Sequence, residues 1–285
     1  MKPPPFGYSR PESVDEAVGM LASHGEDGKV LAGGQSLLPL LNMRLATPGH
    51  LVDINRLSEL SHVRVAGGHV VIGALARHGQ VLADQAACLA QPLLGQALAL
   101  VAHPVIRNRG TTVGSIVHAD PSGEMTAVLA LLGGSVLLAS TGGARLVNAG
   151  AFFLGPLESD VRPGELATQA RIPVLPPRAG TAFAEVSRRN GDYAVCGVAA
   201  LAELDEAGLV SLARAAYLSV AGTPLVLDLT EAGGDLTAAG RLARDRVTPT
   251  SDIHATASYR RHLAGVLTER ALAAAIAHAK ERSDG

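Results

Sequence analysis

Short apolar runs alternate with glycine, proline and polar residues along the first 175 residues of the chain. Ser13 and Glu16 have the spacing of a capping box, and the positions after them predict a helix over Ser13–Ser23. Two β-like runs, on either side of Gly67-Gly68, predict a hairpin. Further strands are expected at Lys29–Leu31, Leu51–Ile54, Ser135–Ala139 and Leu166–Ile172, helices at His78–Ala83, Leu89–Val101 and Met125–Leu132, and a loop at Arg107–Ser115.

The pattern changes after Pro173, Pro176 and Pro177, which makes these prolines the best candidate for a domain boundary. Strand-like runs come first in the second part of the chain, and helical patterns close it. This order predicts a small α+β domain with helices on one face of an antiparallel sheet. The strands are expected at Thr181–Val186, Val195–Ala202 and Ala213–Val220, and the helices at Thr237–Asp245 and Ser258–Lys280.

The composition of the chain excludes several classes of function. Hydrophobic residues make up 47% of the chain, enough for a large core, while a net charge of −2 without basic runs argues against nucleic acid as a partner. No apolar stretch reaches the roughly 18 residues of a membrane span. The N-terminus lacks the pattern of a secretory signal, so we expect a cytoplasmic protein. Cys88 and Cys196 cannot supply the four thiolates of a [2Fe–2S] cluster, so any such centre belongs to a partner.

Two segments rich in glycine and hydroxyl groups carry the candidate chemistry. Ala32-Gly33-Gly34-Gln35-Ser36-Leu37 follows a predicted strand, and its backbone amides and Ser36 hydroxyl suit phosphate oxygens. When this segment is taken alone, a tight turn between strand and helix is the favoured interpretation. Arg107–Ser115 offers a second set of such groups and continues to the carboxylates of Asp120 and Glu124. Two such segments in one chain suit a diphosphate better than a single phosphate.

The other motifs are less specific. His118 and Asp120 lack further ligands at metal-binding spacing, and a satisfied polar loop is the simpler interpretation. His78 is interpreted as a surface or edge histidine. Tyr193, beside the turn at Gly191-Asp192, is suited to stacking on a planar ligand, although a core tyrosine after a turn is the plainer alternative. The chain contains no GxGxxG after a strand, no P-loop, no HExxH and no GxSxG.

Taken together, these segments resemble the FAD-binding medium subunits of bacterial molybdenum hydroxylases, a family that includes carbon monoxide, quinoline and nicotine dehydrogenases. The FAD domain of xanthine dehydrogenase belongs to the same family. The resemblance runs through the whole chain in the same order and spacing. It rests on Ala32–Pro39, Leu51–Ile54, Arg107–Thr111 with His118–Pro121, Arg188-Arg189 with Gly191–Ala194, and Ser251–His254.

The resemblance implies an α+β fold: a two-lobed FAD-binding domain of the vanillyl-alcohol oxidase and cell-wall reductase (PCMH) type over residues 1–175. Its lobes would cover about 1–57 and 58–175, and a small α+β domain of the CO dehydrogenase flavoprotein type would cover 176–285. By the same resemblance, FAD is bound non-covalently, with its pyrophosphate on the amides of both segments. The implied FAD contacts are Ala32, Gly33, Gly34, Gln35, Ser36, Leu37, Thr111, Gly114, Ser115, His118, Asp120, Glu124 near the ribose, Leu166 near the adenine and Tyr193 near the isoalloxazine.

The sequence departs from the family at two positions. Val113 stands where the family's second segment has a glycine, and a β-branched residue is costly there if the backbone needs a positive φ. Relatives also often carry a lysine shortly before the pair of arginines, whereas this chain has Ala184-Glu185. The first departure predicts a relaxed loop or weaker FAD binding. The second predicts a different flavin potential or electron acceptor.

The function implied is electron transfer within a larger enzyme. A large molybdopterin-binding subunit would hydroxylate the substrate, and a small subunit with [2Fe–2S] clusters would deliver electrons to this FAD, in a dimer of heterotrimers. No residue of this chain is expected to be catalytic in the hydroxylation, and no metal is expected in it. Two alternatives remain: a self-contained flavin oxidoreductase, with a covalent link through a histidine such as His103, and an assembly subunit that has lost FAD.

Overall fold

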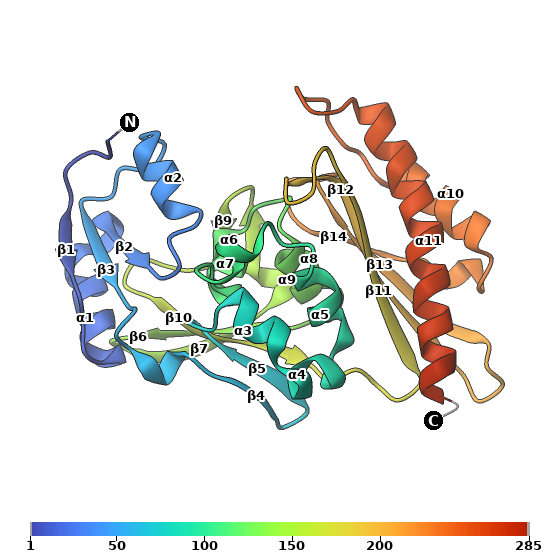
Figure 1. Ribbon diagram of the computed structural model, residues 1–285, viewed down its shortest axis with the longest axis horizontal. Helices are drawn as coiled ribbons and strands as arrows, with labels where there is room; N and C mark the ends of the chain where they lie inside the picture. The colour runs from blue at the N-terminus through green and yellow to red at the C-terminus, as the bar shows by residue number, and fades with distance from the viewer. Residues whose placement is uncertain (1, 284–285) are drawn as a thin grey trace.

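The computed structural model describes residues 2–283, in which three large β-sheets form a row and each is covered by helices on at least one face (Figure 1). A fourth sheet has only two short strands. The N-terminal sheet, the central sheet and the C-terminal sheet follow one another along the longest axis, in chain order. Along the described residues no helix combines the length and the hydrophobicity that crossing a membrane requires.

The N-terminal sheet is parallel, with strand order β1-β3-β2. Ser13 caps the first helix as predicted, because its hydroxyl accepts a hydrogen bond of 3.1 Å from the Glu16 amide. The Glu16 carboxylate accepts from the amide of Glu12 instead of that of Ser13, so only half of the capping box is formed. The elements are β1 (Gly7–Ser9), α1 (Val14–His24), β2 (Gly28–Leu31), α2 (Leu37–Asn42) and β3 (His50–Asp53).

The central sheet is antiparallel, with order β4-β5-β10-β6-β7, and its helices pack on one face (Figure 1). The predicted hairpin is confirmed, and both residues of its Gly67-Gly68 turn have a positive φ. The strands are β4 (Val63–Ala66), β5 (His69–Gly73), β6 (Ser135–Ser140), β7 (Gly143–Asn148) and β10 (Leu166–Pro173). The helices are α3 (His78–Ala83), α4 (Gln85–Ala90), α5 (Pro92–Leu98), α6 (Pro104–Arg107), α7 (Thr112–His118), α8 (Glu124–Leu131) and α9 (Ala149–Phe152), followed by the small strands β8 (Phe153–Gly155) and β9 (Glu158–Ser159).

Two predictions for this region are wrong. The helix expected over Leu89–Val101 is broken, because Pro92 lacks an amide hydrogen and begins a new helix, α5, at its first turn. The loop expected over Arg107–Ser115 is partly helical, because Thr111 acts as the N-cap of α7. Its glycines suggested an irregular loop, although a threonine at position 111 is a common N-cap of a helix.

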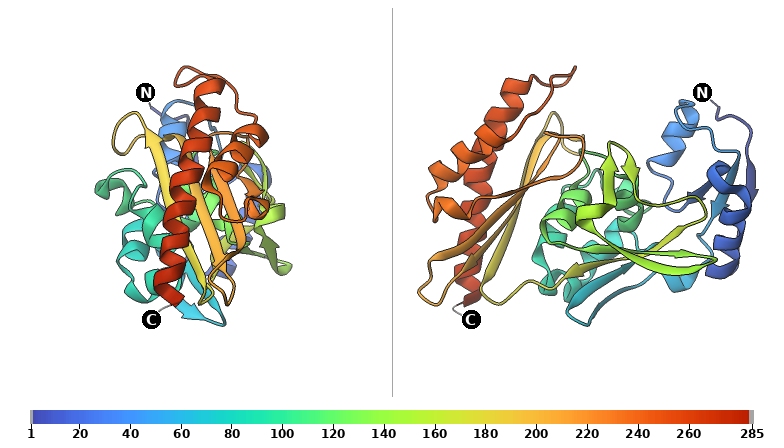
Figure 2. Two further views of the ribbon diagram at one scale, coloured as in Figure 1. Left: turned by 90° about the vertical axis from the view of Figure 1, so that its right-hand side faces the viewer. Right: turned by 180° about the vertical axis from the view of Figure 1, so that it is seen from behind.

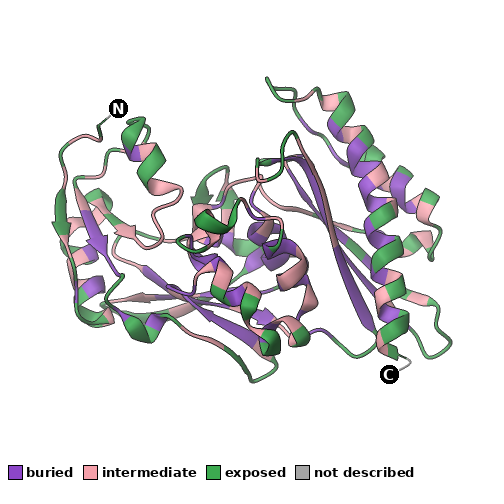
Figure 3. Cartoon of the chain, in the orientation of Figure 1, coloured by how far each residue is buried: buried purple, intermediate pink, exposed green. Residues whose placement is uncertain are grey.

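The C-terminal sheet is antiparallel in the order β11-β12-β13-β14, and α10 and α11 lie along one face, which confirms the predicted arrangement (Figure 2). Its opposite face packs against α5 and α8 of the preceding domain. Both faces are therefore buried, as the continuous purple of β12 shows in Figure 3. The elements are β11 (Ala179–Ser187), β12 (Ala194–Leu204), β13 (Val210–Leu218), β14 (Leu225–Asp228), which the sequence did not predict, α10 (Leu236–Arg246) and α11 (Ala257–Ser283).

Candidate functional site

The first glycine segment leaves β2 and enters α2. Gly34 has φ +73°, a left-handed conformation that glycine adopts without strain. The Gln35 side chain braces the turn by donating to the Gly33 carbonyl at 3.2 Å. Ser36 precedes α2 without capping it, since its hydroxyl makes no bond to the first turn. Among residues 2–283, the amides from Gly33 to Ser36 reach no acceptor, so this segment presents a row of unused donors.

The second glycine segment forms the start of α7. The Thr111 hydroxyl caps the helix by accepting from the Gly114 amide at 3.1 Å. A Cβ on Gly114 would lie 2.4 Å from that hydroxyl oxygen, so a larger residue would displace the cap. Val113 is buried in the first turn with an ordinary helical φ. The expected strain at Val113 is therefore absent, because this position requires no positive φ.

The structure brings both segments into contact across the gap between the first two sheets. A Cβ placed on Gly33 would lie 2.5 Å from the Arg109 carbonyl oxygen and 2.8 Å from the Gly110 Cα. Real Cβ atoms do not approach backbone this closely, so only glycine at position 33 allows the segments to meet. Segments that are about 80 residues apart in the sequence are thus in direct contact.

Two residues that the sequence did not single out connect these segments. The Arg77 guanidinium donates to the Arg109 carbonyl and to the Asn55 Oδ1 atom, each at 2.6 Å. The Asn55 amide group in turn donates to the Ala32 carbonyl at 2.9 Å. One signal was present in the sequence: Asn55 stands two residues after Asp53, at the end of a strand, where Asn and Asp favour turns.

An acidic cluster lies where α8 faces the C-terminal sheet. Burial raises the pKa of Glu124 to about 7, and the nearby Asp120 contributes. Burial, with a contribution from Glu124, raises the pKa of Glu185 to about 8, and its Oε2 atom has no hydrogen-bond partner among the described residues. Tyr193 lies beside the cluster, 67% exposed, and partial burial together with Asp120 and Glu124 raises its pKa.

The remaining predicted contacts lie in different surroundings. His118 ends α7, where burial lowers its pKa, opposed by Asp120 and assisted by Lys29. Leu166 is 1% exposed and sits on β10 in the main hydrophobic core, opposite Ala139 on the neighbouring strand β6. The interpretation of His78 as a surface or edge histidine is wrong. It is 4% exposed, contacts the Thr112 hydroxyl at 3.2 Å, and burial lowers its pKa to about 4.

These donors suit an elongated anion with a planar group attached. Unused amides and the Ser36 hydroxyl stand on one side of the contact, the Thr111 turn stands on the other, and Arg77 supplies positive charge. This set fits the diphosphate of FAD, and Tyr193 is an exposed aromatic ring beside the acidic cluster. No group of three or more His, Cys, Asp or Glu residues within 2–283 could hold a metal ion.

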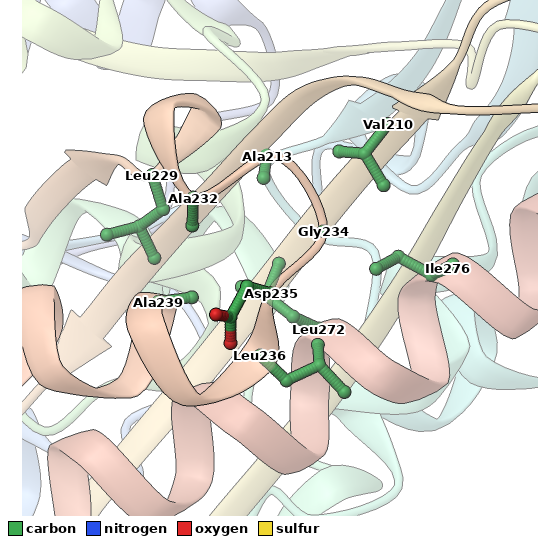
Figure 4. Close-up of a pocket in the computed structure, with 10 residues that line it drawn as sticks. All are labelled: Val210, Ala213, Leu229, Ala232, Gly234, Asp235, Leu236, Ala239, Leu272 and Ile276. Carbon is green, nitrogen blue, oxygen red and sulfur yellow. The ribbon is translucent and has the colours of Figure 1, made fainter.

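A separate hollow lies in the C-terminal domain between α10, α11 and β13 (Figure 4). Leu229, Leu236 and Leu272 are among its apolar lining residues, and Asp235 uses its carboxylate to cap α10. The hollow encloses about 10 Å³, barely the room for one water molecule. It is a packing gap between helices and strands, and the candidate site is therefore the contact between the glycine segments.

The comparisons with known proteins agree with this geometry. Residues 4–175 match the family model described as the FAD binding domain in molybdopterin dehydrogenase. Residues 181–275 match the model described as the CO dehydrogenase flavoprotein C-terminal domain. The first match contains both glycine segments, and the second contains Glu185 and Tyr193.

The similarity to individual proteins extends over the whole chain. The 6-hydroxypseudooxynicotine dehydrogenase complex subunit alpha of Paenarthrobacter nicotinovorans is 39% identical over 98% of this chain and 97% of its own. The caffeine dehydrogenase subunit beta of Pseudomonas sp. (strain CBB1) is also 39% identical, over 96% of each chain. Among solved structures, the carbon monoxide dehydrogenase from Hydrogenophaga pseudoflava that lacks the Mo-pyranopterin moiety matches with a TM-score of 0.92 and 37% identity, over 98% of this chain and 99% of that one.

Proposed function

We propose a role in electron transfer for this chain, which belongs to the family of FAD-binding medium subunits of the molybdenum hydroxylases. In this role it takes electrons from [2Fe–2S] clusters of a partner subunit and passes them to an external acceptor. Bound FAD supplies the chemistry, because it accepts electrons singly and releases them singly or in pairs. The protein binds the cofactor, orients it and sets the charge around it.

The contact between the glycine segments carries this proposal. Gly33 touches the backbone of Arg109 and Gly110, and the amides from Gly33 to Ser36 have no acceptor within the described residues. We assign the binding of the pyrophosphate to Ala32–Leu37 and to Thr111, Gly114 and Ser115. The unused amides of the first segment suit this role, because backbone amides approach an anion more closely than long side chains do. The Gly114 and Ser115 amides already donate to Thr111, so the second segment would contribute through the hydroxyl groups of Thr111 and Ser115.

The other site residues receive roles by their surroundings. We place the isoalloxazine against Tyr193, the most exposed aromatic ring in the region. Glu124, Asp120 and His118 line the path from the second segment to the C-terminal sheet, with Glu124 assigned to the ribose. We assign Leu166 to the adenine side as a buried support of the site, because at 1% exposed it presents no free surface of its own. None of these residues acts on the substrate that the whole enzyme hydroxylates.

The partners follow from what this chain lacks. Cys88 is half-buried in α4 and Cys196 is fully buried on β12, so the described chain holds no thiolate set for an iron–sulfur cluster. We therefore propose a small [2Fe–2S] subunit and a large molybdopterin-binding subunit, assembled as a dimer of heterotrimers. Several relatives are named as a subunit or a medium chain of a dehydrogenase, which supports a multi-subunit enzyme.

Another subunit of the complex determines which substrate is hydroxylated. Relatives of nearly equal identity to this chain are named for caffeine and for carbon monoxide, two molecules with little chemistry in common. A fold that stays the same while the named substrates differ this much does not carry the substrate pocket. We assign the pocket to the large subunit.

Affinity purification from the native host tests the proposal. It should recover a molybdenum protein and an iron–sulfur protein together with this chain. The purified chain should show absorption bands at roughly 370 and 450 nm, and denaturation should release the colour into solution. Recovery of a lone polypeptide with substrate activity, or colour that stays with the denatured chain, would favour the self-contained oxidoreductase. The idea of an assembly subunit without FAD depended on strain at Val113, and the helical φ of that residue removes its support.

A further inference from the structure

We infer that Arg77 and Asn55 are positioning residues that hold the glycine segments at the spacing that FAD requires. The inference rests on the proposed function, because it assumes that FAD is the ligand of these segments. Neither residue belongs to a glycine segment. Their hydrogen bonds form a bridge, defined here as the path from the Arg109 carbonyl through the Arg77 guanidinium and the Asn55 side chain to the Ala32 carbonyl.

The backbone of Arg77 is attached to the second segment. Arg77 pairs with Thr111 in an isolated antiparallel bridge. On either side of this pair, the His78 amide donates to the Gly110 carbonyl at 2.9 Å, and the Thr112 amide donates to the Ala76 carbonyl at 3.1 Å. Arg77 therefore moves with the second segment, and its side chain starts from a fixed point.

The side chains complete the bridge to the first segment. Both Nη atoms of Arg77 are used, one on the Arg109 carbonyl and one on Asn55 Oδ1. Asn55 is itself fixed, because its backbone amide and its side-chain amide both donate to Asp53 Oδ1, at 2.9 and 2.6 Å. Asp53 accepts from the Tyr8 hydroxyl and is 7% exposed, so the far end of the bridge is held by the N-terminal sheet.

The chemistry of the bridge requires these residue types. A planar guanidinium presents donors in a rigid fork, and it can reach two acceptors in different directions at once. A lysine is a point charge without this fork, and it would satisfy one acceptor at the geometry given. An asparagine is needed at the other end, because it accepts from Arg77 and donates to Ala32 through one short side chain.

The bridge also places charge between the segments. Partial burial and the nearby Arg109 lower the pKa of Arg77, but an arginine stays protonated at any physiological pH. Loss of the bridge would therefore weaken FAD binding in two ways: the unused amides would lose their alignment, and the anion would lose a cation that is already fixed in place.

The test measures the FAD dissociation constant of the FAD-depleted full-length chain by flavin fluorescence, for Arg77→Lys, Asn55→Ala and the double variant. We expect each single variant to weaken binding about tenfold, the effect of one or two charge-assisted hydrogen bonds. The double variant should be little worse than either single variant, because both substitutions break the same bridge. Arg64→Lys, on the exposed strand β4, is the matched control and should bind FAD as the unaltered chain does.

Hydrogen exchange followed by mass spectrometry separates positioning from general damage. In the FAD-free variants, the hydrogen-bonded amides of Leu38, Thr112, Gly114 and Ser115 should exchange faster, while those of α11 keep their protection. Unchanged FAD affinity in Arg77→Lys and Asn55→Ala would overturn the inference, and so would additive losses in the double variant or faster exchange throughout the chain. If the unaltered chain itself fails to bind FAD, the proposed function fails with it. If the unaltered chain binds FAD and the bridge variants bind it with the same affinity, the proposed function stands and only this inference is lost.

Discussion

The two glycine segments differ in the way each obtains its shape. The first is an irregular turn that depends on the left-handed backbone of Gly34 and on the absence of a side chain at Gly33. The second is the capped start of a regular helix, in which only Gly114 needs to be small. Both nevertheless meet at the same contact, where Gly33 lies against the backbone of Arg109 and Gly110.

This difference explains which substitutions the chain tolerates. A residue in the first turn of a helix has ordinary φ and ψ angles, so Val113 fits there, and its side chain is buried against the second lobe. No such freedom exists at Gly33, because backbone atoms of the other segment occupy the space that a side chain would need. A glycine in the motif is therefore required at position 33 of the first segment, whereas a larger residue fits at position 113 of the second.

The largest expected effect is that of Gly33→Val. A Cβ that lies 2.5 Å from the Arg109 oxygen forces the segments apart, and we expect FAD affinity to fall more than about a hundredfold, or roughly 3 kcal/mol. The ratio of flavin to protein after gel filtration measures the loss, and circular dichroism checks that the chain remains folded. Gly19→Ala is the control, since a Cβ at this helical glycine meets no atom within 4 Å. Full FAD in folded Gly33→Val would refute the assignment of this segment.

The next effect concerns stability instead of binding. Val113→Gly restores the family residue, but it removes a buried side chain and adds a glycine to a helix. We expect it to lower the free energy of unfolding by about 2–3 kcal/mol without tightening FAD binding. Chemical denaturation of the FAD-free chain gives the first quantity and fluorescence titration the second. Tighter FAD binding in this variant would show that Val113 does weaken the site.

A smaller effect is expected at the cap of α7. Gly114→Val places a Cβ atom against the Thr111 hydroxyl, and Thr111→Ala removes that hydroxyl directly. Each should cost about 1 kcal/mol of stability, the usual value of an N-cap, and should release FAD more readily. The free energy of unfolding and the FAD dissociation constant should both be measured. Gly150→Ala, where a Cβ meets open space, serves as the comparison, and equal FAD retention in all three variants would contradict the role of this segment.

The smallest expected effect is a dependence on pH that comes from the acidic cluster, which lies beyond the end of the second segment. Burial raises the pKa values of Glu124 and Glu185 to about 7 and 8, above their unfolded values, so the folded chain favours the protonated forms. Stability is then greatest in mild acid and falls as the pH rises through these values. We expect a loss of about 1 kcal/mol between pH 6 and 8, less than full linkage gives because Glu185 is partly exposed.

Glu185→Gln should flatten this slope, because an amide has no proton to lose. Thermal unfolding at several pH values measures the slope, and Glu206→Gln, on an exposed turn, should leave it unchanged. A slope that is identical in the Glu185 variant and the unaltered chain would exclude the carboxyl pair as its cause.

Much of the architecture could be predicted from the sequence. The pattern of apolar residues and the Gly67-Gly68 turn predicted the central hairpin. The order of strands and helices after Pro177 predicted the layers of the C-terminal domain. The glycine segments were identified as partners because both offer amides and hydroxyls. Local chemistry was sufficient in these cases, because each feature depends on residues that are close together in the chain.

The bridge and the acidic cluster could not be predicted in this way. Arg77 is one arginine among many in the sequence, and only the fold shows that it reaches both Asn55 and the Arg109 carbonyl. Glu124 and Glu185 are 61 residues apart (185 − 124), and their proximity depends on the packing of α8 against the C-terminal sheet. The boundary near residue 175 and the individual FAD contacts stay predictions.

The C-terminal sheet, covered by α11 on one side and by α5 and α8 on the other, has a consequence for how the chain can be divided. Its apolar residues belong to two cores, one of which it shares with the preceding domain. Cutting the chain near Pro176 would leave a wide hydrophobic face on each fragment, a surface prone to aggregation. The two parts match separate family models, but because they share this core we expect them to unfold together in this molecule.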